Sequence, residues 1–232
     1  MNIETNLVFS PKDEAGYICK KVLLDSDSPL AKSRKLKRYQ ISTREVFGLY
    51  ILSEYRKFIE PRKEWIFTTE ENISDDGAVG VLNENTISYY EKIEQVYLPG
   101  KFLKKQENKS FVENLMDHLN NTKNKGSEYF KDTSLFILND ISSTDSNDYF
   151  DWKDFAEQFF EKLPFLHVYF LGLTSQRYLH NTYYLFSFTD QKHRQNLNGE
   201  FTFDIKIEGI SNFKCLQKIN LLDKTKNVTR TP

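Results

Sequence analysis

Apolar residues recur at helical spacing between residues 43 and 59 of the chain. The sequence Ser42-Thr43-Arg44-Glu45 before them has the form of a capping box, in which the Ser42 and Glu45 side chains satisfy the first free amides. Pro61 follows the segment and ends it. These signals predict an amphipathic helix that ends near residue 59. The residues of its apolar face are Phe47, Tyr50, Ile51, Tyr55 and Phe58.

Short segments rich in β-branched and aromatic residues predict strands along the rest of the chain. They are residues 65–69, 78–82, 86–98, 134–138, 165–173, 182–188 and 201–207, with a further strand or two near residues 17–24. Two amphipathic patterns, at residues 110–125 and 151–163, predict helices between strands. A polar loop is expected at residues 139–147.

The alternation of strand and helix after residue 87 predicts an α/β fold with a mixed central sheet flanked by helices on both faces. The core of that sheet is expected to be mostly parallel, and an early antiparallel hairpin makes it mixed. The apolar runs at residues 134–138 and 165–173 predict strands buried on both faces, at the centre of the sheet.

The length of 232 residues suits one main domain, and 39% hydrophobic residues give it enough apolar surface for a core. We predict an N-terminal extension over residues 1–41, an α/β domain over 42–222 and a loose tail over 223–232. The formal net charge of −1 excludes a uniformly basic coat for nucleic acid, although a local basic groove is compatible with it.

The two cysteines, Cys19 and Cys215, lack any spacing typical of zinc ligands, and we expect both to be reduced thiols. No signal segment and no long apolar run is present, so a cytoplasmic protein without a membrane partner is expected. The four histidines show no metal-binding spacing. His167, in an apolar strand, is interpreted as a buried and satisfied core residue.

The densest basic run of the sequence consists of Lys32, Arg34, Lys35, Lys37 and Arg38. Such a run is usually a solvated surface. The alternative is contact with phosphate groups, because lysine and arginine dominate binding to the nucleic-acid backbone.

Carboxylates gather in an acidic turn and in the strand that follows it. The turn carries Asp75 and Asp76, and the strand at residues 86–98 carries Glu91, Lys92 and Glu94. Turn chemistry alone explains an Asp-Asp-Gly sequence, and cross-strand ion pairs explain the strand residues. The alternative is a site for a hard cation, since carboxylate oxygens are the ligands that Mg²⁺ prefers.

This order of helix, acidic turn, acidic strand, second helix and buried strand resembles the PD-(D/E)xK, or restriction-endonuclease-like, nuclease superfamily. The resemblance covers about residues 43–173, and Lys123, Lys125 and Tyr129 fit its downstream part. It implies a restriction-endonuclease-like fold and an enzyme, a hydrolase that cleaves DNA with Mg²⁺, in restriction or defence.

By that resemblance Glu54, Asp76 and Glu94 would hold the metal, and Asp75 and Glu91 are the rivals of the last two. Glu54 falls on the apolar helix face, where a carboxylate is costly unless it is paired or binds a cation. The other interpretation is a glutamate that reaches solvent at the edge of that face.

The sequence departs from the superfamily at its lysine. Val96 stands two residues after Glu94 and Ile93 stands two residues after Glu91, and neither carries an amine. Lys92 and Glu94 share one face of a regular strand, so Lys92 is the candidate substitute, whereas Gln95 points the other way.

Two functions follow from these patterns. The first is a Mg²⁺-dependent endonuclease acting on DNA, with Glu54, Asp76, Glu94 and Lys92 as catalytic residues and the basic run at residues 32–38 in contact with DNA. The second is a non-catalytic nuclease-like module that binds nucleic acid or a protein partner; a homodimer is compatible with either. The first requires the carboxyl groups of Glu54, Asp76 and Glu94 (or Glu91) to converge on one cation.

Overall fold

The structure is a computed structural model, and it describes the chain in segments. These are residues 8–9, 35–36, 41–68, 76–84, 86–98, 113–114, 117–119, 121, 132–142, 158, 165–173, 182–189, 196–206 and 208–218. The predictions for residues 17–24, for most of 110–125 and of 151–163, and for the tail at 223–232 fall outside these segments.

The described strands form a nine-stranded sheet and a separate two-stranded hairpin, and the principal helix is α2 (Thr43–Ile59). The sheet order is β1-β4-β5-β6-β7-β8-β9-β10-β11, and the hairpin pairs β2 (Lys35–Leu36) with β3 (Ile41–Ser42). The strands of the sheet are β1 (Val8–Phe9), β4 (Glu64–Thr68), β5 (Ala78–Asn83), β6 (Thr86–Leu98), β7 (Thr133–Ser142), β8 (Val168–Leu173), β9 (Thr182–Phe188), β10 (Gly199–Lys206) and β11 (Gly209–Lys218).

The sheet is mixed, and β7 and β8 lie in its interior, which confirms two predictions made from the sequence. Only the pairs β6–β7 and β7–β8 are parallel, whereas the other six pairs are antiparallel. The expectation of a mostly parallel core was therefore wrong. After β8 the chain turns back through a meander of β9, β10 and β11 instead of making further crossovers.

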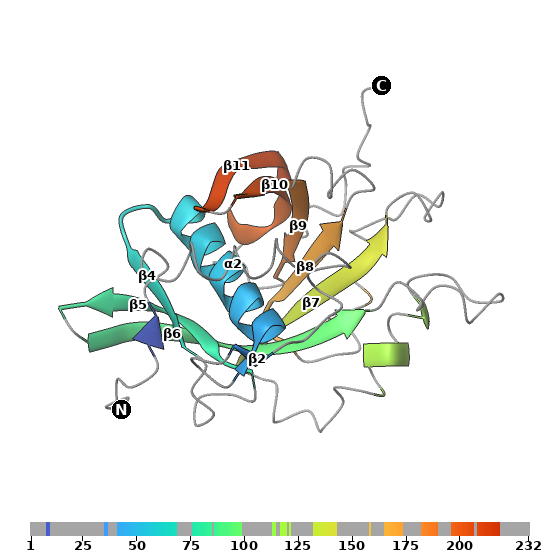
Figure 1. Cartoon of the computed structure of the whole chain (residues 1–232), viewed down its shortest axis with the longest axis horizontal. Helices are drawn as coiled ribbons and strands as arrows, with labels where there is room; N and C mark the ends of the chain where they lie inside the picture. The colour runs from blue at the N-terminus through green and yellow to red at the C-terminus, as the bar shows by residue number, and fades with distance from the viewer. Residues whose placement is uncertain are drawn as a thin grey trace.

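Helix α2 lies in the hollow of the curled sheet (Figure 1). It packs on β4, β5 and β6, and β10 and β11 curl over its other side. The helix is consequently buried on most of its circumference, from Val46 to Ser53 without interruption. Phe58, predicted to be on the buried face, is 39% exposed because it lies at the rim, where it stacks on Phe213 with ring centroids 5.6 Å apart.

Other predicted elements match the structure to different degrees. The predicted bounds of the strand at residues 86–98 and of the strand at 182–188 are those of β6 and β9. The loop predicted at residues 139–147 starts later than expected, since β7 continues to Ser142. Strand β11 had not been predicted. No helix in the described segments is long and apolar enough to cross a membrane.

Gly48 allows α2 to approach the sheet closely. A Cβ atom added at this position would overlap the Gln95 side-chain oxygen and would lie 2.9 Å from Cε1 of Phe136. Phe136 is fully buried, and the Gln95 amide is held by a hydrogen bond from its Nε2 to the Glu45 carbonyl. Neither side chain can move away without loss of contacts.

The substitution Gly48→Ala is expected to lower the free energy of unfolding. Overpacking costs about 1–3 kcal/mol, which exceeds the roughly 1 kcal/mol that alanine gains over glycine inside a helix. Urea denaturation of the variant measures the difference. Lys57→Ala, on the same helix but half-exposed, serves as the control and should change stability by less than about 0.5 kcal/mol. A Gly48→Ala variant more stable than the parent would contradict the close approach.

Candidate functional site

A buried carboxylate, Glu91, lies where α2 packs on β6. Its side chain is an ion pair with Arg56 of α2, and neither side chain has appreciable solvent exposure. Glu91 Oε1 also accepts hydrogen bonds from Ser134 Oγ at 2.5 Å and from Tyr169 Oη at 2.9 Å. Helix α2 and strands β6, β7 and β8 thus all contribute polar groups to a single cluster.

The protonation states of Glu91, Arg56 and Tyr169 are determined by burial and by the groups around them. Burial has the largest single effect on the pKa of Glu91 and raises it, but the Arg56 guanidinium, the neighbouring His167 and the hydrogen bonds together outweigh burial and lower the pKa to about 2. Burial lowers the pKa of Arg56, and the charge and hydrogen bond of Glu91, together with the nearby tyrosines, more than reverse this effect. Burial raises the pKa of Tyr169 well above its usual value. The pair therefore stays ionised near neutral pH, while Tyr169 stays a neutral donor.

A second group of polar side chains adjoins the cluster. His167 Nε2 lies 2.8 Å from Ser187 Oγ, which in turn lies 3.2 Å from Tyr55 Oη. Tyr55 donates a hydrogen bond to the Leu197 carbonyl at 2.7 Å, and the His167 and Tyr169 rings lie 4.3 Å apart. His167 is fully buried. The prediction of a buried core histidine is confirmed, and its Nε2 has a hydrogen-bond partner in Ser187.

The two candidate acids of β6 lie on opposite faces of the sheet. Glu91 contacts Arg56 of α2, and the pairing with β7 runs without a register shift through residues 92–98. Side chains three residues apart on a regular strand point in opposite directions. Glu94 therefore points away from α2, into a buried position, together with the half-buried Lys92.

Glu54 lies far from the acidic turn. Its carboxylate is 3.5 Å from Lys57 Nζ and its side chain is 16% exposed, at the edge of the helix surface. Because a helix rises 1.5 Å per residue, Glu54 lies about 13 Å along the axis from Glu45, which marks the end of α2 near the turn. The interpretation of Glu54 as a glutamate at the edge of the apolar face is the one that the geometry supports.

Asp76 instead meets Gln95 and the start of α2. Asp76 Oδ2 accepts a hydrogen bond from the backbone N–H of Gln95 at 2.6 Å, and Gln95 Nε2 donates to the Glu45 carbonyl at 2.9 Å. Gly77 follows with a φ of 128°, a conformation that glycine adopts without strain, and its carbonyl accepts a hydrogen bond from Ile93. These two hydrogen bonds connect the acidic turn to β6. The side chain of β6 that faces the helix next to this turn is the uncharged amide of Gln95.

The three carboxylates predicted to share a metal are not brought together. Glu54 lies near the last turns of α2. Asp76 lies near the first turn of that helix, to which Gln95 links it. Glu94 lies on the face of the sheet that points away from α2. Among the residues that the structure describes, no three His, Cys, Asp or Glu side chains are grouped closely enough to hold a metal ion. Glu91, the rival strand acid, is held by Arg56 instead. These residues do not fit a shared Mg²⁺ site.

The basic run is linked to the same end of α2. Lys35 lies in β2, which pairs with β3, and β3 runs directly into the helix; Lys35 is opposite Ser42. Lys32, Arg34, Lys37 and Arg38 fall outside the described segments. Lys35 is therefore joined through β3 to the end of α2 where Asp76 and Gln95 lie.

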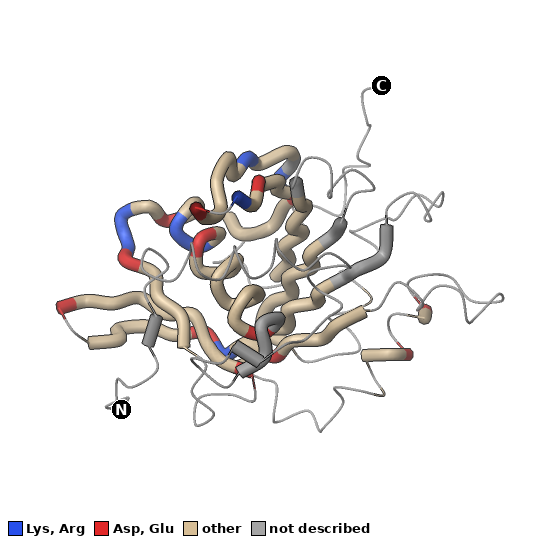
Figure 2. The backbone as a smooth tube through the Cα atoms, in the orientation of Figure 1, with Lys and Arg blue, Asp and Glu red and all other residues tan. Residues whose placement is uncertain are grey.

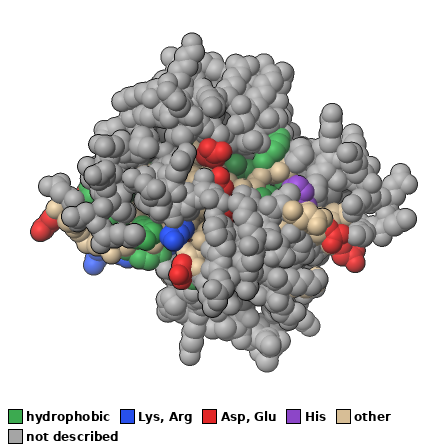
Figure 3. Space-filling view, turned by 90° about the horizontal axis from the view of Figure 1, so that it is seen from below, with side chains coloured by type: hydrophobic (Ala, Val, Ile, Leu, Met, Phe, Trp, Pro, Cys, Tyr) green, Lys and Arg blue, Asp and Glu red, His purple; other side chains and the backbone are tan. Residues whose placement is uncertain are grey.

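The described charges elsewhere are mixed in sign. Figure 2 shows Lys and Arg interspersed with Asp and Glu along the backbone, with a concentration of both signs between α2 and β4. On the face seen in Figure 3, the coloured acidic and basic side chains occur in small groups. Within the described segments of these views, no large patch of one sign stands out.

The sequence analysis did not identify Arg56, which pairs with Glu91, or Gln95, which binds Asp76, as important residues of this site. Gln95 could have been found from the two-residue period of β6, since it shares a face with Glu91. Arg56 gave no such signal, because a basic residue near a helix end is ordinary on its own.

Comparisons of the chain with protein-family models, with curated proteins and with solved structures found no match.

Proposed function

We propose that this chain is a non-catalytic nuclease-like module that binds DNA through the segment around its basic run. The element order of helix α2, antiparallel strands β4, β5 and β6, and a parallel β7 supports a restriction-endonuclease-like core. That order is the basis of the resemblance, and fold alone does not imply function.

One observation favours binding over cleavage. On the α2 side of β6, Glu91 is neutralised by Arg56 and the next polar residue is the uncharged Gln95, which Asp76 binds through its backbone amide. Hydrolysis of a phosphodiester with Mg²⁺ needs several hard oxygen ligands around one ion. Within the described part of the chain, this arrangement offers a single acidic side chain, Asp76, beside Gln95, so the catalytic hypothesis is the weaker of the two; Asp75 lies outside the described segments.

A binding role fits the hairpin that precedes α2. The basic run has five cationic residues within seven positions, and β2–β3 joins it to the start of the helix. Lysine and arginine side chains that neutralise phosphates release counterions, so affinity falls steeply as salt rises.

Binding of a short DNA duplex, measured by fluorescence anisotropy over a series of salt concentrations, tests this function. The triple variant with Lys32, Lys35 and Lys37 changed to Gln should bind more weakly and lower the salt slope by roughly one for each lysine. The matched control changes the exposed Lys206, Lys214 and Lys218 to Gln, with the same loss of charge, and should keep the slope of the parent.

A plasmid-cleavage assay with Mg²⁺ separates the two functions. The parent is expected to leave the plasmid intact while it binds DNA. Cleavage that disappears in Asp76→Ala would restore the catalytic hypothesis. Absence of salt-dependent binding, or equal losses in the two triple variants, would exclude the basic run as a DNA contact.

A further inference from the structure

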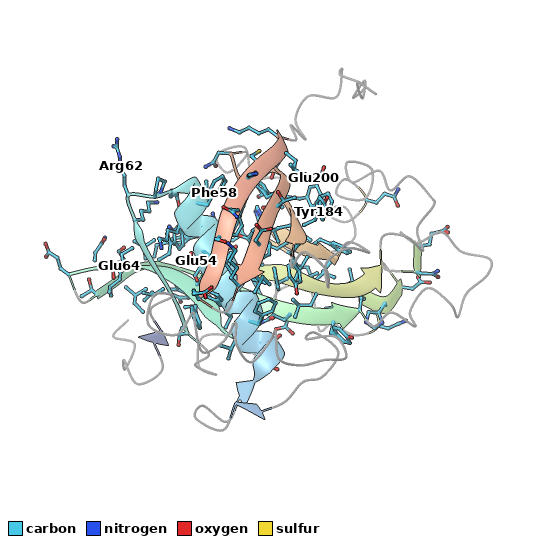
Figure 4. The ribbon with its side chains drawn as sticks, turned by 45° about the horizontal axis from the view of Figure 1, so that its top comes forward. Glu54, Phe58, Arg62, Glu64, Tyr184 and Glu200 are labelled. Carbon is cyan, nitrogen blue, oxygen red and sulfur yellow. The ribbon has the colours of Figure 1, made fainter. Side chains whose placement is uncertain are left out.

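We draw no further inference here: the strongest candidate, the apolar surface patch where Phe58 at the end of α2 (Figure 4) stacks on Phe213 of β11, carries none because nothing in the described part of the chain shows what covers it.

Discussion

Replacement of Glu91 by glutamine is expected to lower the free energy of unfolding by about 3–5 kcal/mol. The substitution keeps the shape of the side chain but leaves the Arg56 guanidinium charged and buried, with a side-chain exposure of 4%. It also weakens the acceptor for Ser134 and Tyr169. Urea denaturation at neutral pH, monitored by circular dichroism, measures the loss.

The chain offers a matched control for this change. Glu54→Gln makes the same chemical substitution at an ion pair on the helix edge, where Lys57 is 43% exposed, and should cost no more than about 1 kcal/mol. The double variant Arg56→Met/Glu91→Gln also removes the buried guanidinium charge and should be more stable than Glu91→Gln alone. Equal losses in Glu91→Gln and Glu54→Gln would show that the buried pair has no special role.

Acid is expected to destabilise the protein through the same carboxylate. The folded pKa of Glu91, about 2, lies below its ordinary value of 4.5. The contribution of ionised Glu91 to the free energy of unfolding is therefore complete above about pH 5 and is lost as the pH falls through 2. The reason is that, as the pH falls, the carboxyl group takes up a proton in the unfolded state before it does so in the folded state. A difference of this size corresponds to about 3 kcal/mol, to order of magnitude.

Comparison with Glu91→Gln isolates this contribution from that of the other carboxylates. Between pH 5 and pH 2 the stability of the parent should fall by about 3 kcal/mol more than that of the variant. Where the variant is too unstable, ¹³C NMR of the Glu91 carboxyl group in the parent gives its folded pKa directly. An ordinary pKa in that titration would contradict the buried ion pair.

The sequence carried enough information for the elements whose signals are local. The bounds of β6 and β9 were predicted correctly because each segment is rich in β-branched and aromatic residues. Strand β11 was missed because its larger apolar residues, Ile210, Phe213 and Leu216, recur every three residues and not every two. Leu216 is 51% exposed, so the strand has no regular buried face. Its pairing with β10 is also irregular.

The candidate site depended on information that is not local. That Glu91 and Glu94 lie on opposite faces follows from strand geometry, but which of them meets α2 depends on where the helix packs. The choice of Arg56 as the partner of Glu91 is likewise tertiary, since 35 residues separate the two in the chain. Whether these carboxylates can share a metal ion therefore depends more on the face of the sheet on which each lies than on their spacing in the sequence.

The curl of β10 and β11 over α2 has a consequence for the order in which this chain can fold. Tyr50 accepts a hydrogen bond from the Ile210 amide at 3.2 Å, and Tyr55 binds the Leu197 carbonyl, across separations of 160 and 142 residues. During synthesis, α2 emerges from the ribosome long before the strands that cover it. Until β10 and β11 have been synthesised, the aromatic side chains of α2 that these strands cover in the folded protein remain uncovered. A topology with such distant contacts folds slowly, and nascent chains of this protein will expose that apolar surface for most of their synthesis.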